Sequence, residues 1–153
     1  MVSHPMSGNR IAIPEVRLAV WGFLLNAVWE ALQSPLYRDF DRGAGYLVRT
    51  RLHCTGGDVL ILLAAFWVTS LAFRTRQWAV ARGLPAASLF VAIGLAYTAW
   101  SEVHNTQVIR TWAYAAAMPQ IAGIGLGPLL QWSVLPLALV WLLRRGPGYE
   151  AAS

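Results

Sequence analysis

Long apolar runs separated by short polar segments set the pattern of this chain. Three runs, Leu18–Leu32, His53–Phe73 and Pro85–His104, each approach the length of about 20 residues that a membrane-spanning helix needs. A fourth run, Trp112–Leu143, is longer than one span and is interrupted by glycines and prolines. We therefore divide it into an interfacial or re-entrant piece over 112–121 and a spanning helix over 122–143.

The polar segments predict the connections between these helices. Arg38–Arg51 carries four arginines, two aspartates and a Gly-Ala-Gly turn, which is typical of a loop at the membrane surface. We expect a flexible arm over 1–13, a single domain over 14–145 and a flexible tail over 146–153. The pattern predicts an all-α, polytopic membrane protein built as a bundle of four transmembrane helices.

Composition agrees with this class. Of the 153 residues, 57% are hydrophobic and only 12% are charged, and the mean hydropathy is +0.48. Four spans use nearly the whole chain and leave no room for a separate soluble domain. The single cysteine, Cys54, excludes an internal disulfide.

Charge bears on orientation. All twelve basic residues are arginines, and the formal net charge is +5. Because they flank apolar runs, they indicate membrane orientation and contact with anionic lipid, and we expect no nucleic-acid partner. With the amino terminus inside, seven arginines are cytoplasmic and five are not, which predicts that both termini are cytoplasmic. The cytoplasmic set is Arg10, Arg17, Arg74, Arg76, Arg82, Arg144 and Arg145, and the opposite set is Arg38, Arg42, Arg49, Arg51 and Arg110.

Three acids, Glu30, Asp58 and Glu102, lie in different apolar runs. A carboxylate in hydrocarbon costs roughly 2.5–3.5 kcal/mol on insertion scales, so such residues usually face a bundle interior and serve a function there. In an up-and-down bundle the end of the first helix, the start of the second, the end of the third and the start of the fourth share one membrane face. We therefore predict that the three acids meet there as catalytic groups.

Other polar and aromatic residues fall at the same end. Asn26, Glu30 and Gln33 have the i, i+4, i+7 spacing of one helix face. The predicted substrate-binding residues are Asn26, Trp29, Gln33, Tyr97, Trp100, Ser101, Asn105, Trp112 and Tyr114. The candidate metal ligands are His53, Cys54 and His104.

Simpler interpretations exist for the acids and small polar residues. Glu30 reaching to the interface, Asp58 acting as an acid at a helix start, and Glu102 pairing with Arg110 would each be structural. Small polar residues such as Asn26 contribute to contacts between helices in many membrane proteins. Gly123 and Gly127 are better explained as small residues that allow close helix packing than as part of a phosphate loop, because no strand precedes them.

Five segments together carry a resemblance. They are Trp29–Tyr37, Gly57-Asp58, Ser101-Glu102 with Asn105, Trp112-Ala113-Tyr114 with Met118-Pro119, and Gly125–Trp132. This pattern resembles a group of small, uncharacterised bacterial integral membrane proteins. The resemblance implies a four-helix inner-membrane protein and brings no activity with it.

Three functions remain open from the sequence. The first is an isomerase-type or cyclase-type enzyme that uses the acids for proton transfer on a lipophilic small molecule, because acids close together in a low-dielectric site cannot all be ionised. The second is an accessory subunit that joins a membrane-protein partner or a homo-oligomer. The third is a metal-binding or haem-binding protein, whereas the first requires no cofactor.

Overall fold

The computed structural model describes residues 13–145, and helices dominate this part of the chain. Its α-helices are α1 (Pro14–Gln33), α2 (Ala44–Phe73), α3 (Trp78–Ala81), α4 (Gly83–Val103) and α5 (Leu126–Arg144). A π-helical turn, His104–Val108, continues α4, and two-residue strands β1 (Gln120–Ile121) and β2 (Ile124–Gly125) form a small antiparallel hairpin. The predicted all-α class is confirmed. The predicted arm over 1–13, apart from Ile13, and the tail over 146–153 lie outside the described residues.

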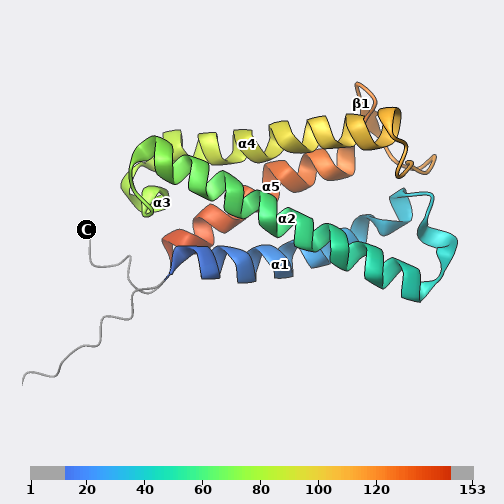
Figure 1. The fold of residues 1–153 in the computed structure, drawn as a ribbon, viewed down its shortest axis with the longest axis horizontal. Helices are drawn as coiled ribbons and strands as arrows, with labels where there is room; N and C mark the ends of the chain where they lie inside the picture. The colour runs from blue at the N-terminus through green and yellow to red at the C-terminus, as the bar shows by residue number, and fades with distance from the viewer. Residues whose placement is uncertain (1–12, 146–153) are drawn as a thin grey trace, which may run out of the picture.

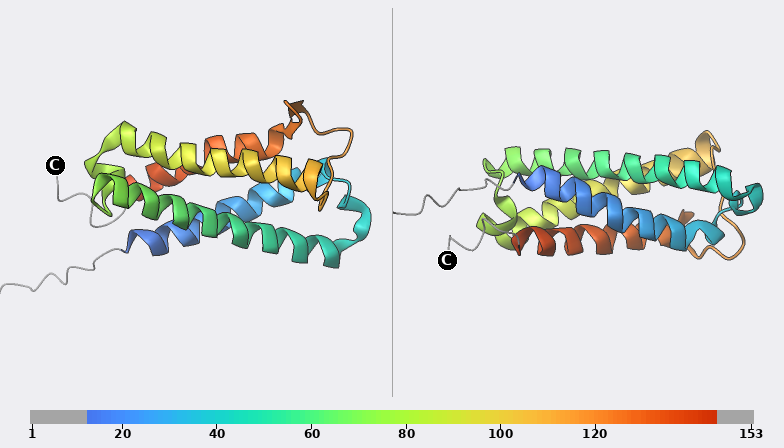
Figure 2. Two further views of the ribbon diagram at one scale, coloured as in Figure 1. Left: turned by 45° about the horizontal axis from the view of Figure 1, so that its top comes forward. Right: turned by 90° about the horizontal axis from the view of Figure 1, so that it is seen from below.

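The four long helices pack side by side (Figures 1 and 2). Helix α1 contacts α2 and α5, and α4 contacts the same two helices. The segments 34–43 and 109–125 lie together at one end of the molecule, and α3 lies at the other end with the two ends of the described chain (Figure 1). This up-and-down arrangement brings together the helix ends that the sequence assigned to one face.

The outer surface of the bundle is strongly apolar. Leu60, Leu71 and Leu84 are each at least 68% exposed, and many other large apolar side chains also point outward. An exposed apolar surface of this extent suits contact with lipid. Three helical segments are long and apolar enough to cross a membrane, namely Ala44–Phe73, Gly83–Val108 and Leu126–Arg144.

The apolar core occupies the half of the bundle near α3. The ring of Trp78 lies between Phe66 and Phe90, with centroid distances of 5.6 and 5.1 Å, and all three side chains are buried. Nearer the middle, Trp132 of α5 packs against Gly94 of α4, where a Cβ atom would lie 2.4 Å from the indole ring. The interior of the other half of the bundle contains most of the polar side chains described below.

Two predicted helix boundaries are wrong. Helix α2 begins at Ala44 rather than near His53, because after Gly43, whose φ is +93°, no residue interrupts the helix. It has 30 residues and spans about 45 Å at 1.5 Å per residue, so its first turns extend beyond a hydrocarbon core of about 30 Å. The predicted surface loop is correspondingly shorter than Arg38–Arg51.

Helix α5 begins at Leu126 rather than at residue 122. Ala122 and Gly123 both have positive φ, 51° and 79°, as a tight two-residue hairpin turn requires. Gly123 therefore belongs to this turn and not to a helix–helix contact, which corrects its predicted role. The segment 112–121 contains no helix and ends in strand β1. It folds over the end of the bundle (Figure 1).

Candidate functional site

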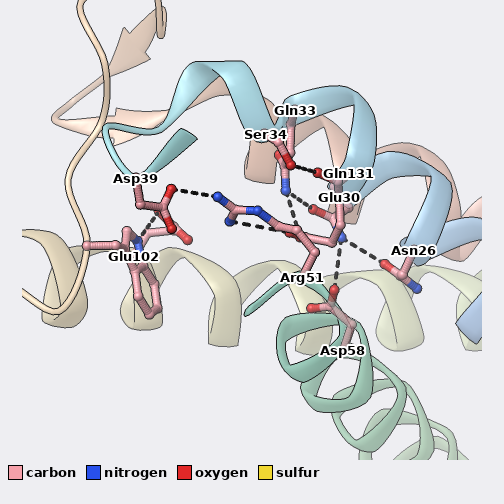
Figure 3. A network of polar contacts seen from close by, with 10 residues as sticks. Asn26, Glu30, Gln33, Ser34, Asp39, Arg51, Asp58, Glu102 and Gln131 are labelled. Atoms are coloured by element: carbon pink, nitrogen blue, oxygen red, sulfur yellow. Dashed lines mark hydrogen bonds and ion pairs between the residues drawn. The ribbon is translucent and has the colours of Figure 1, made fainter. Parts of the chain in front are cut away.

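A cavity of about 350 Å³ lies at the polar end of the bundle, between the four long helices. Glu30 of α1, Asp58 of α2 and Glu102 of α4 all line it, and Gln131 of α5 completes the set (Figure 3). The structure therefore brings the three predicted acids to one cavity. Their position follows from the up-and-down helix order. Glu30 and Glu102 lie near the C-terminal ends of α1 and α4, and Asp58 lies halfway along α2, which runs in the opposite direction.

Gln131 joins the helices through its amide group. Its Nε2 donates to Asn26 Oδ1 at 2.8 Å and to Asp58 Oδ2 at 3.0 Å, and its Oε1 accepts from Gln33 Nε2 at 3.1 Å (Figure 3). The side chain is only 2% exposed. One amide thus contacts α1 and α2 from α5, in the interior, where an unpaired polar group would be costly.

The carboxylate of Glu30 accepts a hydrogen bond and forms a weak ion pair. Gln33 Nε2 donates to its Oε1 at 2.7 Å, and Arg51 Nη1 lies 3.9 Å from its Oε2. Arg51 is bound more closely to Asp39, at 2.6 Å, and its guanidinium lies 5.1 Å from the centre of the Tyr37 ring. Arg51 therefore links the start of α2 to the connection between α1 and α2.

Glu102 is held by two aromatic donors from the segment after α4. Its Oε2 accepts hydrogen bonds from the hydroxyl of Tyr114 and, at 3.5 Å, from Nε1 of Trp112. Burial, followed by the hydrogen bond to Glu102, raises the pKa of Tyr114 above its ordinary value, so the phenol remains a donor at neutral pH. Glu102 forms no ion pair with an arginine in the described chain, so the simpler interpretation, a pair with Arg110 or another loop arginine, does not fit the structure.

Two connections close the polar end of the bundle together. Tyr37 and Tyr114 form an isolated antiparallel bridge, in which Arg38 N donates to Ala113 O at 3.0 Å and Ala115 N to Leu36 O at 2.9 Å. These backbone bonds fix the position of Tyr114 above Glu102. The non-helical segment after α4 thus supplies the two donors that hold Glu102.

The simpler interpretations of Glu30 and Asp58 do not fit the structure. Glu30 is 6% exposed and hydrogen-bonded in the interior, so it does not reach to the interface. Asp58 lies fourteen residues after the first residue of α2, so a helix-start role is wrong because the helix begins earlier than predicted. Asn26 does join neighbouring helices, through its bond with Gln131.

The predicted binding residues divide into two groups. Those that line the cavity are Gln33, Tyr97, Ser101 and Trp112. The others, which do not line it, are Asn26, Trp29, Trp100, Asn105 and Tyr114. Of these, Trp100 is 59% exposed and stacks on His104, whereas Asn26 and Tyr114 hold cavity residues in place.

The candidate metal ligands do not converge. His53 and Cys54 line the cavity, but His104 is stacked on the exposed Trp100. Within residues 13–145 no three histidine, cysteine or acidic side chains are close enough together to hold a metal ion.

Sequence reasoning missed several members of the site. Gln131 could have been found, because it is the one amide side chain in the apolar helix α5. Arg51 and Asp39 gave no such signal, since they lie in a segment that reads as a surface loop, and Tyr37 lies just after the proline that was expected to end the first helix.

Comparison with known proteins does not assign the site. No protein-family model matches the chain, and neither a curated protein nor a solved structure matches it. The resemblance described above therefore stays a prediction, and the function has to be argued from the site itself.

Proposed function

We propose that this protein is an integral membrane enzyme that moves protons on a lipophilic small molecule. The observation that supports this proposal is the convergence of Glu30, Asp58 and Glu102, from three helices, on one cavity within an apolar bundle. Placing three carboxyl groups in such surroundings is costly, and acids within membrane helices usually serve a function. Purely structural acids would be expected to pair with arginines, yet among residues 13–145 only Glu30 of these three acids has an arginine within ion-pair distance, at 3.9 Å.

The hydrogen bonds leave each acid with an oxygen for chemistry. Gln33 binds one oxygen of Glu30, Gln131 binds one oxygen of Asp58, and both aromatic donors bind the same oxygen of Glu102. A protonated carboxyl group would give its proton to a double bond or an oxygen of the substrate. A second, ionised carboxylate would remove a proton from a neighbouring carbon, so that the net reaction is an isomerisation or cyclisation that needs no cofactor.

The proposal includes the placement of the chain in a membrane. All four long helices, α1 included, cross the bilayer of a bacterial inner membrane, and both termini lie on the cytoplasmic side. The seven-to-five distribution of arginines supports this orientation. The cavity then lies near the opposite face, where a lipophilic substrate reaches it from the bilayer.

The test works without an identified substrate. Purified protein in lipid nanodiscs is incubated with a bacterial lipid extract in deuterated buffer, and the lipids are analysed by mass spectrometry. Proton transfer to carbon adds deuterium to at least one lipid species in the presence of the wild-type protein. We expect Glu102→Gln to abolish this incorporation while circular dichroism shows an unchanged helical content.

The control is Asp41→Asn, which removes an exposed acid that does not line the cavity. It should retain full incorporation. Deuterium incorporation that is the same with wild-type protein, with Glu102→Gln and without protein would refute the proposed activity.

A further inference from the structure

We propose that the cavity binds the head end of a single-chain lipid alcohol, whose chain leaves the protein sideways, between α2 and α4, into the bilayer. This inference names the substrate class and the entry route of the same cavity, and so rests on the proposed function for its relevance to catalysis. The binding itself can be measured without turnover.

The exposure of the lining residues locates the opening of the cavity. Every lining residue from α1 and α5 is buried. In contrast, none of the lining residues from α2 is buried, and Tyr97 of α4 is 45% exposed. Helices α1 and α5 therefore form the floor of the cavity, and its opening lies between α2 and α4.

The paths of α2 and α4 explain this opening. Beside α3 the two helices are joined by Trp78, whose ring packs against Phe66 of α2 and Phe90 of α4. Toward the polar end of the bundle they diverge (Figure 1). On the floor of the cavity, by contrast, Gln131 of α5 is hydrogen-bonded to Asn26 of α1 at 2.8 Å. The bundle is thus closed on one side and open on the other.

The opening extends from the membrane surface into the acyl-chain region. With Phe73 at the cytoplasmic boundary, a hydrocarbon core of about 30 Å covers about 20 residues of α2 and ends near His53. Thr50 then lies at the level of the lipid headgroups, and Ile61, eight residues beyond His53, lies about 12 Å inside the core. A ligand in the opening therefore contacts both regions of the bilayer.

The surface end of the opening suits a small uncharged head. Tyr46, Thr50 and Thr111 line it with hydroxyl groups, which can donate or accept hydrogen bonds. Arg51 and Asp39, which also line this end, are paired with each other at 2.6 Å. A phosphate or ammonium head would find no free partner of opposite charge among these five residues, whereas an alcohol needs none.

The deep end of the opening suits an alkyl chain. Ile61 of α2, Tyr97 of α4 and Trp132 of α5 line it with apolar and aromatic surface. The cavity volume of about 350 Å³ is near the lower end of the range for small-molecule sites, roughly 300–1,000 Å³. The cavity therefore holds the head and first carbons of a lipid, and the rest of the chain passes the exposed Tyr97 into the bilayer.

The acids lie between these two ends. Asp58 is five residues beyond His53 on α2, and Glu102 is five residues from Tyr97 on α4, on the side of the membrane surface. A lipid alcohol held in this way presents the carbons next to its hydroxyl group to both acids. For an unsaturated alcohol, one carboxyl group adds a proton to a carbon of the double bond and a carboxylate removes a proton from the adjacent carbon. The double bond moves by one position and the composition of the lipid is unchanged.

Photolabelling with two forms of one lipid alcohol tests the orientation. Both probes are hexadecanol with one diazirine group, placed either close to the hydroxyl group or at the far end of the chain, and each is activated with light in nanodiscs that contain the protein. Peptide mass spectrometry locates the label. We expect the head-side probe to label residues within 50–61 and 97–102 and the tail-end probe to leave them largely unlabelled. Excess hexadecanol should remove the head-side label, and excess hexadecane should not.

Two neighbouring glycines of α2 provide matched variants. Gly57 lines the cavity, whereas Gly56 lies on the adjoining face of the helix, in a groove with Val20 and Phe23. An added Cβ atom meets nothing within 4 Å at either position. Gly57→Trp should fill the opening and weaken binding of the head-side probe by at least about tenfold, and Gly56→Trp should change it by less than about twofold.

Equal labelling of the wild type and Gly57→Trp, labelling of the cavity by the tail-end probe alone, or displacement by hexadecane as effective as by hexadecanol would overturn the inference. The label map of the wild type decides the question if Gly57→Trp fails to fold. Deuterium incorporation without the expected label map would overturn this inference alone. The expected label map without deuterium incorporation would overturn the proposed enzyme and leave the lipid site standing.

Discussion

Replacement of Gln131 by leucine tests the polar interior most directly. The change keeps the volume of the side chain and removes three hydrogen bonds, at 2.8, 3.0 and 3.1 Å, to Asn26, Asp58 and Gln33. Hydrogen bonds between helices in membrane proteins average about 0.6 kcal/mol and reach about 1.7 kcal/mol. The loss of three such bonds should lower the free energy of unfolding by at least about 2 kcal/mol. The substitution also leaves the buried Oδ1 of Asn26 without a donor, so the total expected loss is about 2–4 kcal/mol.

The assay is reversible unfolding in mixed micelles of increasing sodium dodecyl sulfate content, followed by circular dichroism. The matched control is Ser133→Ala on the same helix, because the Ser133 hydroxyl donates only to the carbonyl of Leu129, at 2.7 Å, within its own helix. This control should change the free energy of unfolding by less than about 0.5 kcal/mol.

A double-mutant cycle with Asn26→Leu isolates the contact between α1 and α5. The double variant should be less destabilised than the sum of the single variants, because Asn26 and Gln131 share one of the lost bonds. If Gln131→Leu is within about 0.5 kcal/mol of the wild type, the amide does not hold the bundle together and the described network has no energetic importance.

Two further predictions concern packing and pH. Gly94→Ala places a Cβ atom 2.4 Å from the Trp132 ring and should destabilise the bundle by about 1–3 kcal/mol in the same assay, whereas Gly56→Ala, which meets no atom within 4 Å, should be neutral or stabilising. An equal effect of the two substitutions would contradict the close approach of α4 and α5. Because burial and then Glu102 raise the pKa of Tyr114, Glu102→Gln should let Tyr114 ionise at a lower pH than in the wild type. Tyrosinate absorbance, with Tyr114→Phe to assign the signal, checks this, and unchanged midpoints would be evidence against the contact.

The sequence was sufficient to predict which ends of the helices meet. Apolar runs of spanning length require helices in lipid, and short connections require neighbouring helices to alternate in direction. From these two constraints alone, Glu30, Asp58 and Glu102 are expected at one end, as the structure has them. The four-helix placement in a membrane remains a prediction, since three segments meet the requirements of length and hydropathy.

Which face of each helix points toward the cavity was harder to predict. For α4, the helical period was sufficient to decide it. Thr98 and Glu102 are four residues apart and both are buried on the cavity side. At 100° per residue, Trp100 lies about 200° from each of them and has to point away. Its exposure of 59% agrees with this geometry, so treating every aromatic residue near an acid as a binding residue ignored the helical period.

The contacts around Arg51 could not be predicted, because they depend on tertiary structure. An arginine at the membrane surface usually remains hydrated, and nothing local to Arg51 distinguishes it from Arg49, which is exposed. Arg51 turns inward because α2 continues past the surface and the connection between α1 and α2 folds back to place Asp39 within 2.6 Å. Helix length and loop path together decide the role of this side chain.

Helix α1 has the length of a membrane-spanning helix but a lower hydropathy than the three candidate spans. It has 20 residues, about 30 Å at 1.5 Å per residue, which matches the thickness of a bilayer core, yet it is not among the three segments apolar enough to qualify by composition. The residues that lower its hydropathy in the polar half are Asn26, Glu30 and Gln33, and all three are buried and bonded to one another or to α5. Its outward-facing positions, such as Val28 and Leu32, remain apolar and are 61% and 74% exposed. A helix whose polar side chains are buried inside the bundle can cross a membrane despite a low mean hydropathy, because lipid contacts only its outer face.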